Sequence, residues 1–240
     1  MNPLLAPKTT LYGRRKGRPL RKNKTMLISE LLPKLVFTLT SEGTTPKNLF
    51  KSKGPLWLEV GFGTGDHLIS QFLNNPSVNF IGCEPFLGGI AGLLQHIEEH
   101  TYHHDRIKLY TQDAQSLLRG LAPETIDKIF VLFPDPWPKK RHHKRRFIQD
   151  ATLQEMLRIL KSTGTLTLAS DHADYFLAME KLVTNLADLK IVEHGILPHS
   201  SELDLRPPFW PMTRFERKAH EANRVCRFLI IQKCAASFKL

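Results

Sequence analysis

Short apolar runs alternate along the chain with longer stretches in which apolar residues recur every three or four positions. The short runs resemble buried strands and lie at residues 56–60, 78–84, 107–113, 128–133, 165–170, 189–195 and 225–233. Helical spacing fills segments between the first five runs, at residues 68–73, 90–99 and 147–160. This alternation is typical of a mostly parallel sheet with helices on both faces, so we predict an α/β fold with seven strands.

The N-terminal part of the chain departs from this rhythm. Residues 26–39 have apolar positions at helical spacing, and we expect Pro33 to limit the first helix. Before them, Gly13 and Gly17 interrupt any amphipathic helix. We predict a basic, flexible arm over residues 1–25 and a single domain over residues 26–240.

The net charge of +11 is concentrated in two places. Residues 1–25 contain eight Lys or Arg, residues 139–146 contain six, and neither stretch contains an acid. Without them the chain would be slightly acidic. Two cation clusters on an acidic body favour binding to a polyanion, although either one alone is compatible with a solvated loop.

Cysteine usage and hydropathy limit the cellular setting. Cys83, Cys226 and Cys234 are widely spaced and form no paired metal-binding motif. This usage favours a reducing compartment, and we expect a cytoplasmic protein. No apolar run reaches the length of a membrane span, so we expect no membrane partner.

Glycines and acids follow the first predicted strand, at the edge where α/β sheets bind ligands. The sequence there is EVGFGTGDH, which places Glu59 before Gly61, Gly63 and Gly65. Alternate glycines let the backbone turn tightly and approach a ligand closely. Because acids stand on both sides of the loop, it disfavours a pyrophosphate and favours a cofactor with a cationic end.

Two further strand ends add acids to this edge. Glu84 follows the second strand and suits the two hydroxyls of a ribose. Asp113 and Ala114 follow the third strand and suit an adenine amino group. Together these features predict an adenosine cofactor without phosphates. S-adenosylmethionine fits, because its sulfonium and amino groups match the acidic loop.

Asp135 follows the fourth strand, in the stretch FPDPWPKKRHHKRR. Pro134 and Pro136 lack backbone donors and restrict the chain, so we expect the carboxylate on a stiff loop at the cofactor edge. The alternative is a proline-rich turn in which Trp137 packs as an apolar plug.

With these motifs in place, the chain resembles the bacterial tRNA (guanine-N7-)-methyltransferases. The resemblance covers nearly the whole chain and is carried by YGRRKGRPL, EVGFGTG, GCEP, QDA, FPDPWPKKRHHKRR, SDHADY and TRFERKAH. FPDPW with its basic run is highly specific, and TRFE is a second, independent match. Pro138 and Lys140 depart from the residues common in the family, at positions outside the roles below.

The resemblance implies a Rossmann-like methyltransferase fold that uses S-adenosylmethionine to methylate N7 of guanine 46, in the variable loop of tRNA. Its cofactor positions correspond here to Glu59, Glu84, Asp113 and Asp135, and its catalytic residue to Asp135. Its substrate-contacting positions correspond to Lys139, Asp171, Thr213, Arg214, Phe215 and Glu216. Its RNA-binding stretch corresponds to Arg141, His142, His143, Lys144, Arg145 and Arg146. We expect tRNA as the partner, no metal, no obligatory protein partner, and a monomer or homodimer.

The chemistry of guanine fits this set of residues. N7 has a free lone pair at neutral pH, so positioning and electrostatics matter more than a general base. Guanine N1–H and its 2-amino group can both donate to one carboxylate, for which the candidates are Asp135, Asp171 and Glu216. The basic run would hold phosphates beside the base, and the arm could order on the same RNA through Arg14, Arg15, Lys16 and Arg18.

Three rival interpretations stay open at this point. The stretch HIEEH, from His96 to His100, matches a helical metal-binding pattern and would indicate a metal-dependent hydrolase. A DNA or protein methyltransferase would carry Asp-Pro-Pro-Tyr after its fourth strand, where this chain has Asp-Pro-Trp. A non-catalytic RNA-binding module would keep the fold and lose the site, against which the intact glycine loop and four acids argue.

Overall fold

A single seven-stranded sheet forms the centre of the computed structural model, which describes residues 17, 19–39, 43–100, 104–198 and 206–234. The strands are β1 (Leu56–Val60), β2 (Asn79–Cys83), β3 (Ile107–Tyr110), β4 (Ile126–Leu132), β5 (Leu160–Ser170), β6 (Leu189–Ile196) and β7 (Arg227–Lys233). Their order is β3-β2-β1-β4-β5-β7-β6. The first five are parallel, and β7 runs antiparallel to both β5 and β6. The seven predicted strands and the mostly parallel sheet are confirmed.

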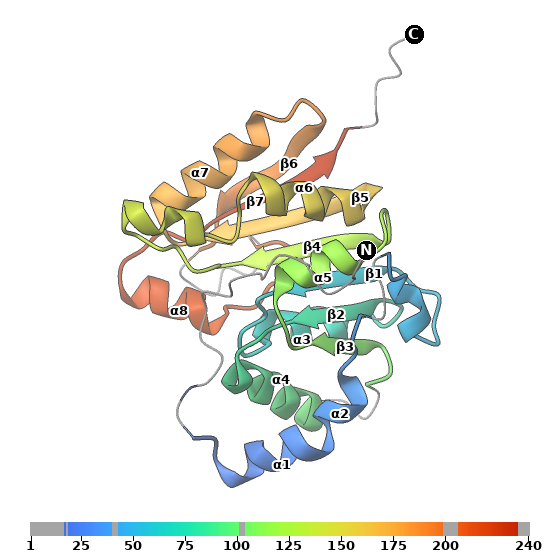
Figure 1. Ribbon diagram of the computed structural model, residues 1–240. Helices are drawn as coiled ribbons and strands as arrows, with labels where there is room; N and C mark the ends of the chain where they lie inside the picture. The colour runs from blue at the N-terminus through green and yellow to red at the C-terminus, as the bar shows by residue number, and fades with distance from the viewer. Residues whose placement is uncertain (1–16, 18, 40–42, 101–103, 199–205, 235–240) are drawn as a thin grey trace.

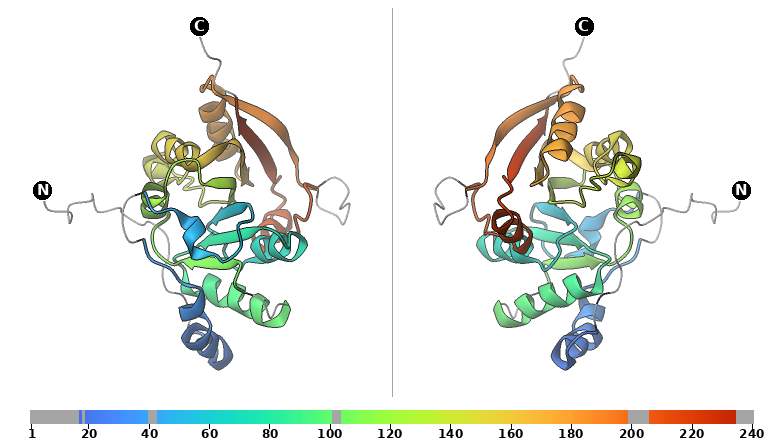
Figure 2. Two further views of the ribbon diagram at one scale, coloured as in Figure 1. Left: turned by 90° about the vertical axis from the view of Figure 1, so that its right-hand side faces the viewer. Right: turned by 90° about the vertical axis from the view of Figure 1, so that its left-hand side faces the viewer.

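Helices cover both faces of this sheet (Figures 1 and 2). One layer contains α5 (Ala114–Gly120), α6 (Asp150–Ile159) and α7 (Ala173–Thr184). The other contains α1 (Lys22–Glu30), α2 (Leu32–Leu35), α3 (Asp66–Asn74), α4 (Leu87–His100) and α8 (Arg214–Glu221). Two short 3₁₀ helices, η1 (Pro46–Leu49) and η2 (Lys140–Arg145), lie in connections.

Strand β1 shows how the sequence produces these layers. All five of its residues are buried. Leu56, Leu58 and Val60 face the core on the α5–α7 side, while Trp57 faces the core on the α3–α4 side. Burying each large apolar side chain contributes about 1.5–3 kcal/mol, so a central strand carries apolar residues on both faces, and Glu59 is the one exception in β1.

Backbone hydrogen bonds just beyond the parallel strands keep the carboxyl ends of neighbouring strands aligned. Gly61 donates its N–H to the Cys83 carbonyl at 2.7 Å, and Glu84 donates to the Tyr110 carbonyl at 3.1 Å. Beyond β4, Phe133 donates to the Ala169 carbonyl at 2.9 Å. The loops that follow these strands therefore start from one edge of the sheet, the edge beside which α8 lies in Figure 1.

The predicted N-terminal boundary needs correction. Helix α1 begins at Lys22, so the last residues of the expected arm belong to the helical layer. The helical spacing over residues 26–39 corresponds to two helices that meet at Leu31, and the first of them ends at Glu30, before Pro33. The arm residues Arg14, Arg15, Lys16 and Arg18 lie outside the described residues. In the described ranges, no helix is both long and apolar enough to cross a bilayer.

Candidate active site

The glycine loop after β1 turns sharply toward α3. Gly61, Gly63 and Gly65 have φ angles of 75°, 56° and 85°, in a region that other residues rarely adopt. A Cβ on Gly61 would meet no atom within 4 Å, so the space beside this residue is open. A Cβ on Gly65 would stand 2.6 Å from Leu93 Cδ1 on α4. The expected tight turn is confirmed.

Glu84 closes the glycine loop from the end of β2. Its Oε2 accepts the Gly63 N–H at 2.9 Å, and its Oε1 accepts the Phe86 N–H at 2.9 Å. Burial raises the pKa of Glu84, and the charges of Asp135 and Glu59 raise it further. The two N–H donors lower it, but by less. Glu84 thus lies close enough to Glu59 and Asp135 for their charges to disfavour its ionised form. A cation bound among them would relieve that repulsion.

Glu59 is the most enclosed of these three acids, with 4 % of its surface exposed. Its Oε2 lies 2.8 Å from Nδ1 of His67, a buried side chain in the first turn of α3. A hollow beside this pair is bounded by Asp66 from α3 and by Thr213 and Phe215 from the C-terminal part of the chain. Residues distant in the sequence therefore meet at the predicted cofactor edge.

Asp113 has a local partner that the sequence pattern did not indicate. Its Oδ2 accepts the backbone N–H of Ser116 at 3.0 Å and the Ser116 hydroxyl at 3.2 Å. Asp113 is therefore the N-cap of α5, and Ala114 is the first residue of that helix. The cap holds the Asp113 carboxylate beside the end of β3.

Asp135 stands on a loop bracketed by two residues with unusual backbone geometry. Phe133 and Trp137 have φ angles of 52° and 43°, which large side chains adopt only when their surroundings require it. The Pro136 carbonyl accepts the Nε–H of Arg146 at 2.9 Å. The carboxylate itself is exposed. The loop is thus constrained at three points around an accessible acid.

The basic run after this loop forms η2, and four of its cations face solvent: Lys139, Lys140, Arg141 and Lys144. Arg145 lies over the Trp137 ring at 5.0 Å, and His142 packs edge-on against the same ring at 5.9 Å. The His143 Nε2 atom lies 3.8 Å from Asp174 Oδ2. The outward cations form a positive surface directly beside Asp135.

Arg146 corrects the expectation that every cation of the run contacts RNA. Its side chain is buried, with only 7 % of the residue exposed. Besides the bond to Pro136, it donates from Nη2 to Asp174 Oδ2 at 2.6 Å and lies over the Tyr175 ring at 4.7 Å. Its guanidinium therefore ties the Asp135 loop to α7 and is not available to a phosphate.

Glu216 also differs from its expected role. Thr213 and Glu216 form a reciprocal capping box at the start of α8. The Glu216 carboxylate is fully buried and forms an ion pair with Arg206. It cannot reach a guanine from this position, because its oxygens are directed into the protein. The candidates for the guanine edge are reduced to Asp135 and Asp171.

The other predicted substrate-contacting residues lie near the glycine loop or at the strand ends. Phe215 is half exposed, and its ring would lie 2.9 Å from a Cβ on Gly63. Arg214 is exposed, and its backbone hydrogen bond helps to hold the pKa of Asp66 at about 2, after the larger effect of His96. Asp171, at the end of β5, pairs through Oδ2 with Arg224 Nε at 2.7 Å.

The HIEEH pattern does bring potential metal ligands together. Donor atoms of His96, Glu99 and His100 lie within 4.8 Å of one another on α4. Glu99 and His100 are exposed, and His96 Nε2 lies 3.7 Å from Asp66 Oδ1. Because two of the three side chains are exposed and the third pairs with Asp66, the cluster by itself gives no support to a metal-dependent hydrolase.

The chain is similar to known methyltransferases. A protein-family model described as "putative methyltransferase" matches residues 53–229. A tRNA (guanine-N(7)-)-methyltransferase of Rhodospirillum rubrum is 38% identical over 227 residues, which cover 92% of this chain and 87% of that protein. One of Agrobacterium fabrum is 39% identical over 226 residues, covering 91% and 92%.

Solved structures match at the level of the fold. A 16S rRNA methyltransferase matches with a TM-score of 0.57 at 14% identity, covering 81% of this chain and 95% of that one. An antibiotic-related methyltransferase matches with a TM-score of 0.56 at 14% identity, covering 78% and 92%.

The fold and the site together define an S-adenosylmethionine-dependent methyltransferase with a Rossmann-like sheet. Within that class, the chain belongs to the tRNA (guanine-N(7)-)-methyltransferase family. The residues present fit the cofactor, because an open glycine turn lies beside the Glu84 carboxylate, whose pKa is raised by burial and by the nearby charges of Asp135 and Glu59. The rival metal-dependent and non-catalytic interpretations are thereby set aside.

Proposed function

We propose that this enzyme methylates N7 of a guanine in the variable loop of tRNA, at position 46, and forms 7-methylguanosine. The observation that carries the proposal is the adjacency of two surfaces on one loop. Asp135 stands beside the acidic cofactor edge, and outward-facing cations begin four residues later, at Lys139. A methyl donor with a positive charge and a polyanionic acceptor would meet between them.

The relatives' names support tRNA guanine as the acceptor. Guanine N7 is an accessible acceptor atom, so its lone pair forms the new N–C bond while the methyl carbon–sulfur bond of the bound cofactor breaks. The positive charge passes from sulfur to the guanine. No proton has to leave N7, and the chain needs to supply orientation and electrostatic stabilisation rather than a general base.

Each cofactor residue has a distinct part in this proposal. Glu59 and Glu84 keep negative charge at the glycine loop, where they would receive the amino group and the ribose hydroxyls. Asp113, held as a helix cap, marks the adenine end of the same edge. We assign the backbone of Gly61, Gly63 and Gly65 and of Ala114 to close contact with the cofactor.

Asp135 is the proposed catalytic residue because it is exposed, constrained and close to the cofactor acids. Its charge would stabilise the cationic guanine as the methyl group transfers. Asp171 is the second acid in reach of the strand ends, with its charge shared by Arg224. We propose that one of these two carboxylates accepts the N1–H and 2-amino donors of guanine.

The outward side chains of η2 would hold the RNA. Lys139, Arg141 and Lys144 are exposed beside the catalytic loop and suit phosphate oxygens. His142 and Arg145 would add contacts around Trp137, and His143 would add a contact beside Asp174. Thr213, Arg214 and Phe215 would approach the substrate from α8. We propose action in the cytoplasm as a monomer or homodimer, without an obligatory protein partner.

The test supplies the enzyme with methyl-labelled S-adenosylmethionine and, separately, bulk tRNA, ribosomal RNA or duplex DNA. The labelled nucleic acid is digested to nucleosides and the products are identified. The expected result is label in tRNA as 7-methylguanosine. Label in DNA, or on an exocyclic amine of any nucleoside, would show that the proposed acceptor is wrong.

A further inference from the structure

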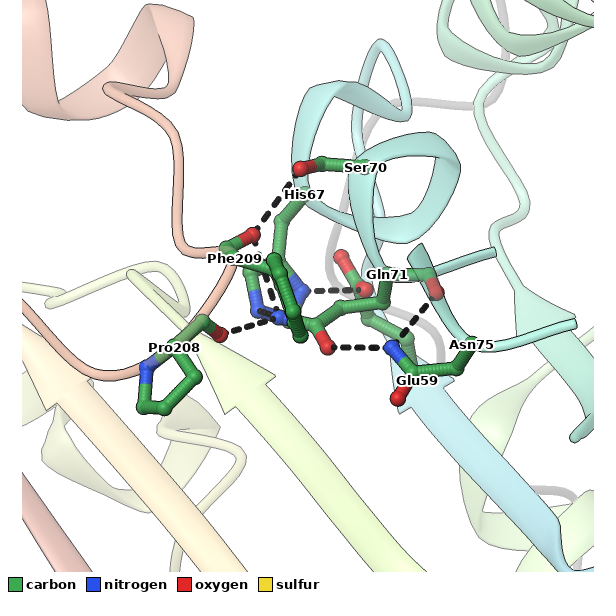
Figure 3. A network of polar contacts seen from close by, with 7 residues as sticks. All are labelled: Glu59, His67, Ser70, Gln71, Asn75, Pro208 and Phe209. Atoms are coloured by element: carbon green, nitrogen blue, oxygen red, sulfur yellow. Dashed lines mark hydrogen bonds and ion pairs between the residues drawn. The ribbon is translucent and has the colours of Figure 1, made fainter. Parts of the chain in front are cut away.

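A buried chain of polar contacts leads from the cofactor acid Glu59 to the C-terminal segment that precedes α8 (Figure 3). His67 Nδ1 lies 2.8 Å from Glu59 Oε2, and His67 Nε2 lies 3.3 Å from Gln71 Nε2. The same Gln71 nitrogen donates to the carbonyls of Pro208 and Phe209, each at 3.1 Å. Two segments about 140 positions apart are thereby joined through one turn of α3.

The partners allow one assignment of the hydrogens. A carboxylate and two carbonyls only accept, so His67 Nδ1 must carry a proton toward Glu59 and Gln71 must direct its NH₂ group toward the carbonyls. His67 Nε2 then faces the same NH₂ group as a third acceptor, so the two amide hydrogens of Gln71 are shared among Nε2 and the two carbonyls. The Gln71 Oε1 atom accepts from Asn75 at 3.3 Å, which agrees with this orientation.

Aromatic rings surround the imidazole in this position. Its centroid lies 4.8 Å from that of Phe130 and 5.3 Å from that of Trp210, and His67 is 2 % exposed. Water is largely excluded, so the two polar contacts are strong and the ring has little freedom to rotate. The rings therefore fix the distance between Glu59 and Gln71.

The far end of the chain of contacts is a turn next to the proposed substrate residues. Phe209 has a φ angle of 59°, and its carbonyl also accepts the Ser70 hydroxyl at 2.9 Å. Thr213, which caps α8, follows four residues later. Anchoring the Phe209 carbonyl to α3 thus sets where Thr213 and Phe215 stand beside the glycine loop.

We propose that His67 and Gln71 are positioning residues: together they hold the Glu59 carboxylate and the segment before α8 in one fixed relation. The inference rests on the proposed function, in which Glu59 faces the cofactor and Thr213–Phe215 face the RNA. His67 supplies a donor to Glu59, and Gln71 anchors the segment. Removing the His67 contact to Glu59 should therefore affect cofactor binding, and removing the Gln71 contacts to the segment should affect tRNA.

Three substitutions separate these contacts. His67→Phe keeps an aromatic ring between Phe130 and Trp210 but removes both ring nitrogens. His67→Asn retains an amide donor near the position of Nδ1 and loses the acceptor for Gln71. Gln71→Met keeps the length of the side chain and removes its donors to the Pro208 and Phe209 carbonyls.

Cofactor affinity is measured by calorimetry without RNA, and kcat/KM for tRNA is measured at saturating cofactor. We expect His67→Phe to weaken both by about tenfold, since small displacements of positioned groups have large effects. His67→Asn should restore cofactor affinity to within about twofold of the wild type and leave kcat/KM for tRNA low. Gln71→Met should behave like His67→Asn.

Thr125→Val is the matched structural control. It removes a buried hydroxyl bonded to the Ala122 carbonyl, next to the start of β4 and away from the strand ends. It should lower the melting temperature and change neither parameter. If the three α3 variants changed only the melting temperature, or if His67→Asn bound cofactor as weakly as His67→Phe, the inference would be overturned. Failure of the wild-type enzyme to methylate tRNA would instead contradict the proposed function. The cofactor affinities, which are measured without RNA, would still test the contact between His67 and Glu59.

Discussion

The cofactor edge and the basic segment η2 are neighbours, but their charged side chains differ in burial and in bonding. At the cofactor edge, Glu59 and Glu84 are buried and bonded to a histidine or to backbone N–H groups. In and just before η2, the side chains of Lys139, Arg141 and Lys144 are exposed. A small cationic ligand suits the first arrangement, since fixed charges need no reorganisation. A large polyanion suits the second, since it brings its own shape and many charges.

Asp135 lies between these regions, and its removal should have the largest effect. We expect Asp135→Asn to lower kcat by about 10²–10³, the range typical for removing one group that stabilises charge in a transition state. Folding should be unaffected because the side chain is exposed. Steady-state kinetics with tRNA and a thermal melt measure both. Asp188→Asn, an exposed acid just before β6 at the opposite edge, should stay within about twofold. A kcat equal to wild type in Asp135→Asn would remove Asp135 from catalysis.

Neutralising the outward cations should weaken binding without altering the chemistry. Replacing Lys139, Arg141 and Lys144 together by Ala should reduce the log–log salt slope of tRNA affinity by about 0.7–0.9 for each phosphate that the variant no longer neutralises. Filter binding at several salt concentrations measures the slope. The control removes the same charge at the far edge, from Lys51, Lys53 and Lys190, which are also exposed. Equal slopes for the two triple variants would show that net charge, rather than this surface, governs binding.

Arg146 belongs to the basic run in the sequence, but its side chain is buried. Arg146→Ala should lower the free energy of unfolding by about 1–3 kcal/mol, since the Pro136 carbonyl and Asp174 lose a charged donor. Chemical denaturation measures this loss. Arg141→Ala, at an exposed position, should change it by less than about 0.5 kcal/mol. Similar unfolding curves for the two variants would contradict the inward placement of Arg146.

The smallest expected effect is the pH dependence of cofactor affinity. Burial raises the pKa of Glu84 above its ordinary value of 4.5, and Asp135 and Glu59 raise it further. The ionised form favours a cationic ligand, so affinity for S-adenosylmethionine should rise with pH through this pKa and level off above it. Calorimetry from pH 7 downward follows the change. Glu84→Gln should show a flatter profile, and a wild-type profile as flat as that of the variant would contradict this role.

Much of the fold could be predicted because it depends on local patterns. The run LWLEV matches β1 at both ends, and the positions of the other six strands follow the same apolar pattern. The glycine loop was predictable because alternate glycines after a buried strand have few other uses. The positions of Glu84 and Asp135 at strand ends were also predictable, since parallel strands end at one edge.

What could not be predicted depends on partners distant in the chain. Arg146 looks like its basic neighbours, and its contacts with the Pro136 carbonyl and with Asp174 and Tyr175 on α7 hold it inward. Glu216 belongs to a family motif, yet its carboxylate is buried in an ion pair with Arg206. His67 follows the glycine loop by two residues, and this nearness was an available signal. Its link to the Phe209 carbonyl through Gln71 required the tertiary structure.

The central claim is most directly tested by mapping the methylated nucleotide in a single tRNA transcript. After reaction with S-adenosylmethionine, the transcript is reduced and treated with aniline, which cleaves the chain at 7-methylguanosine. The account predicts one cleavage, at guanine 46 of the variable loop, and none when that guanine is replaced by adenine or when Asp135→Asn is used for the same short time. Cleavage at another guanine, or at many guanines with equal intensity, would contradict it.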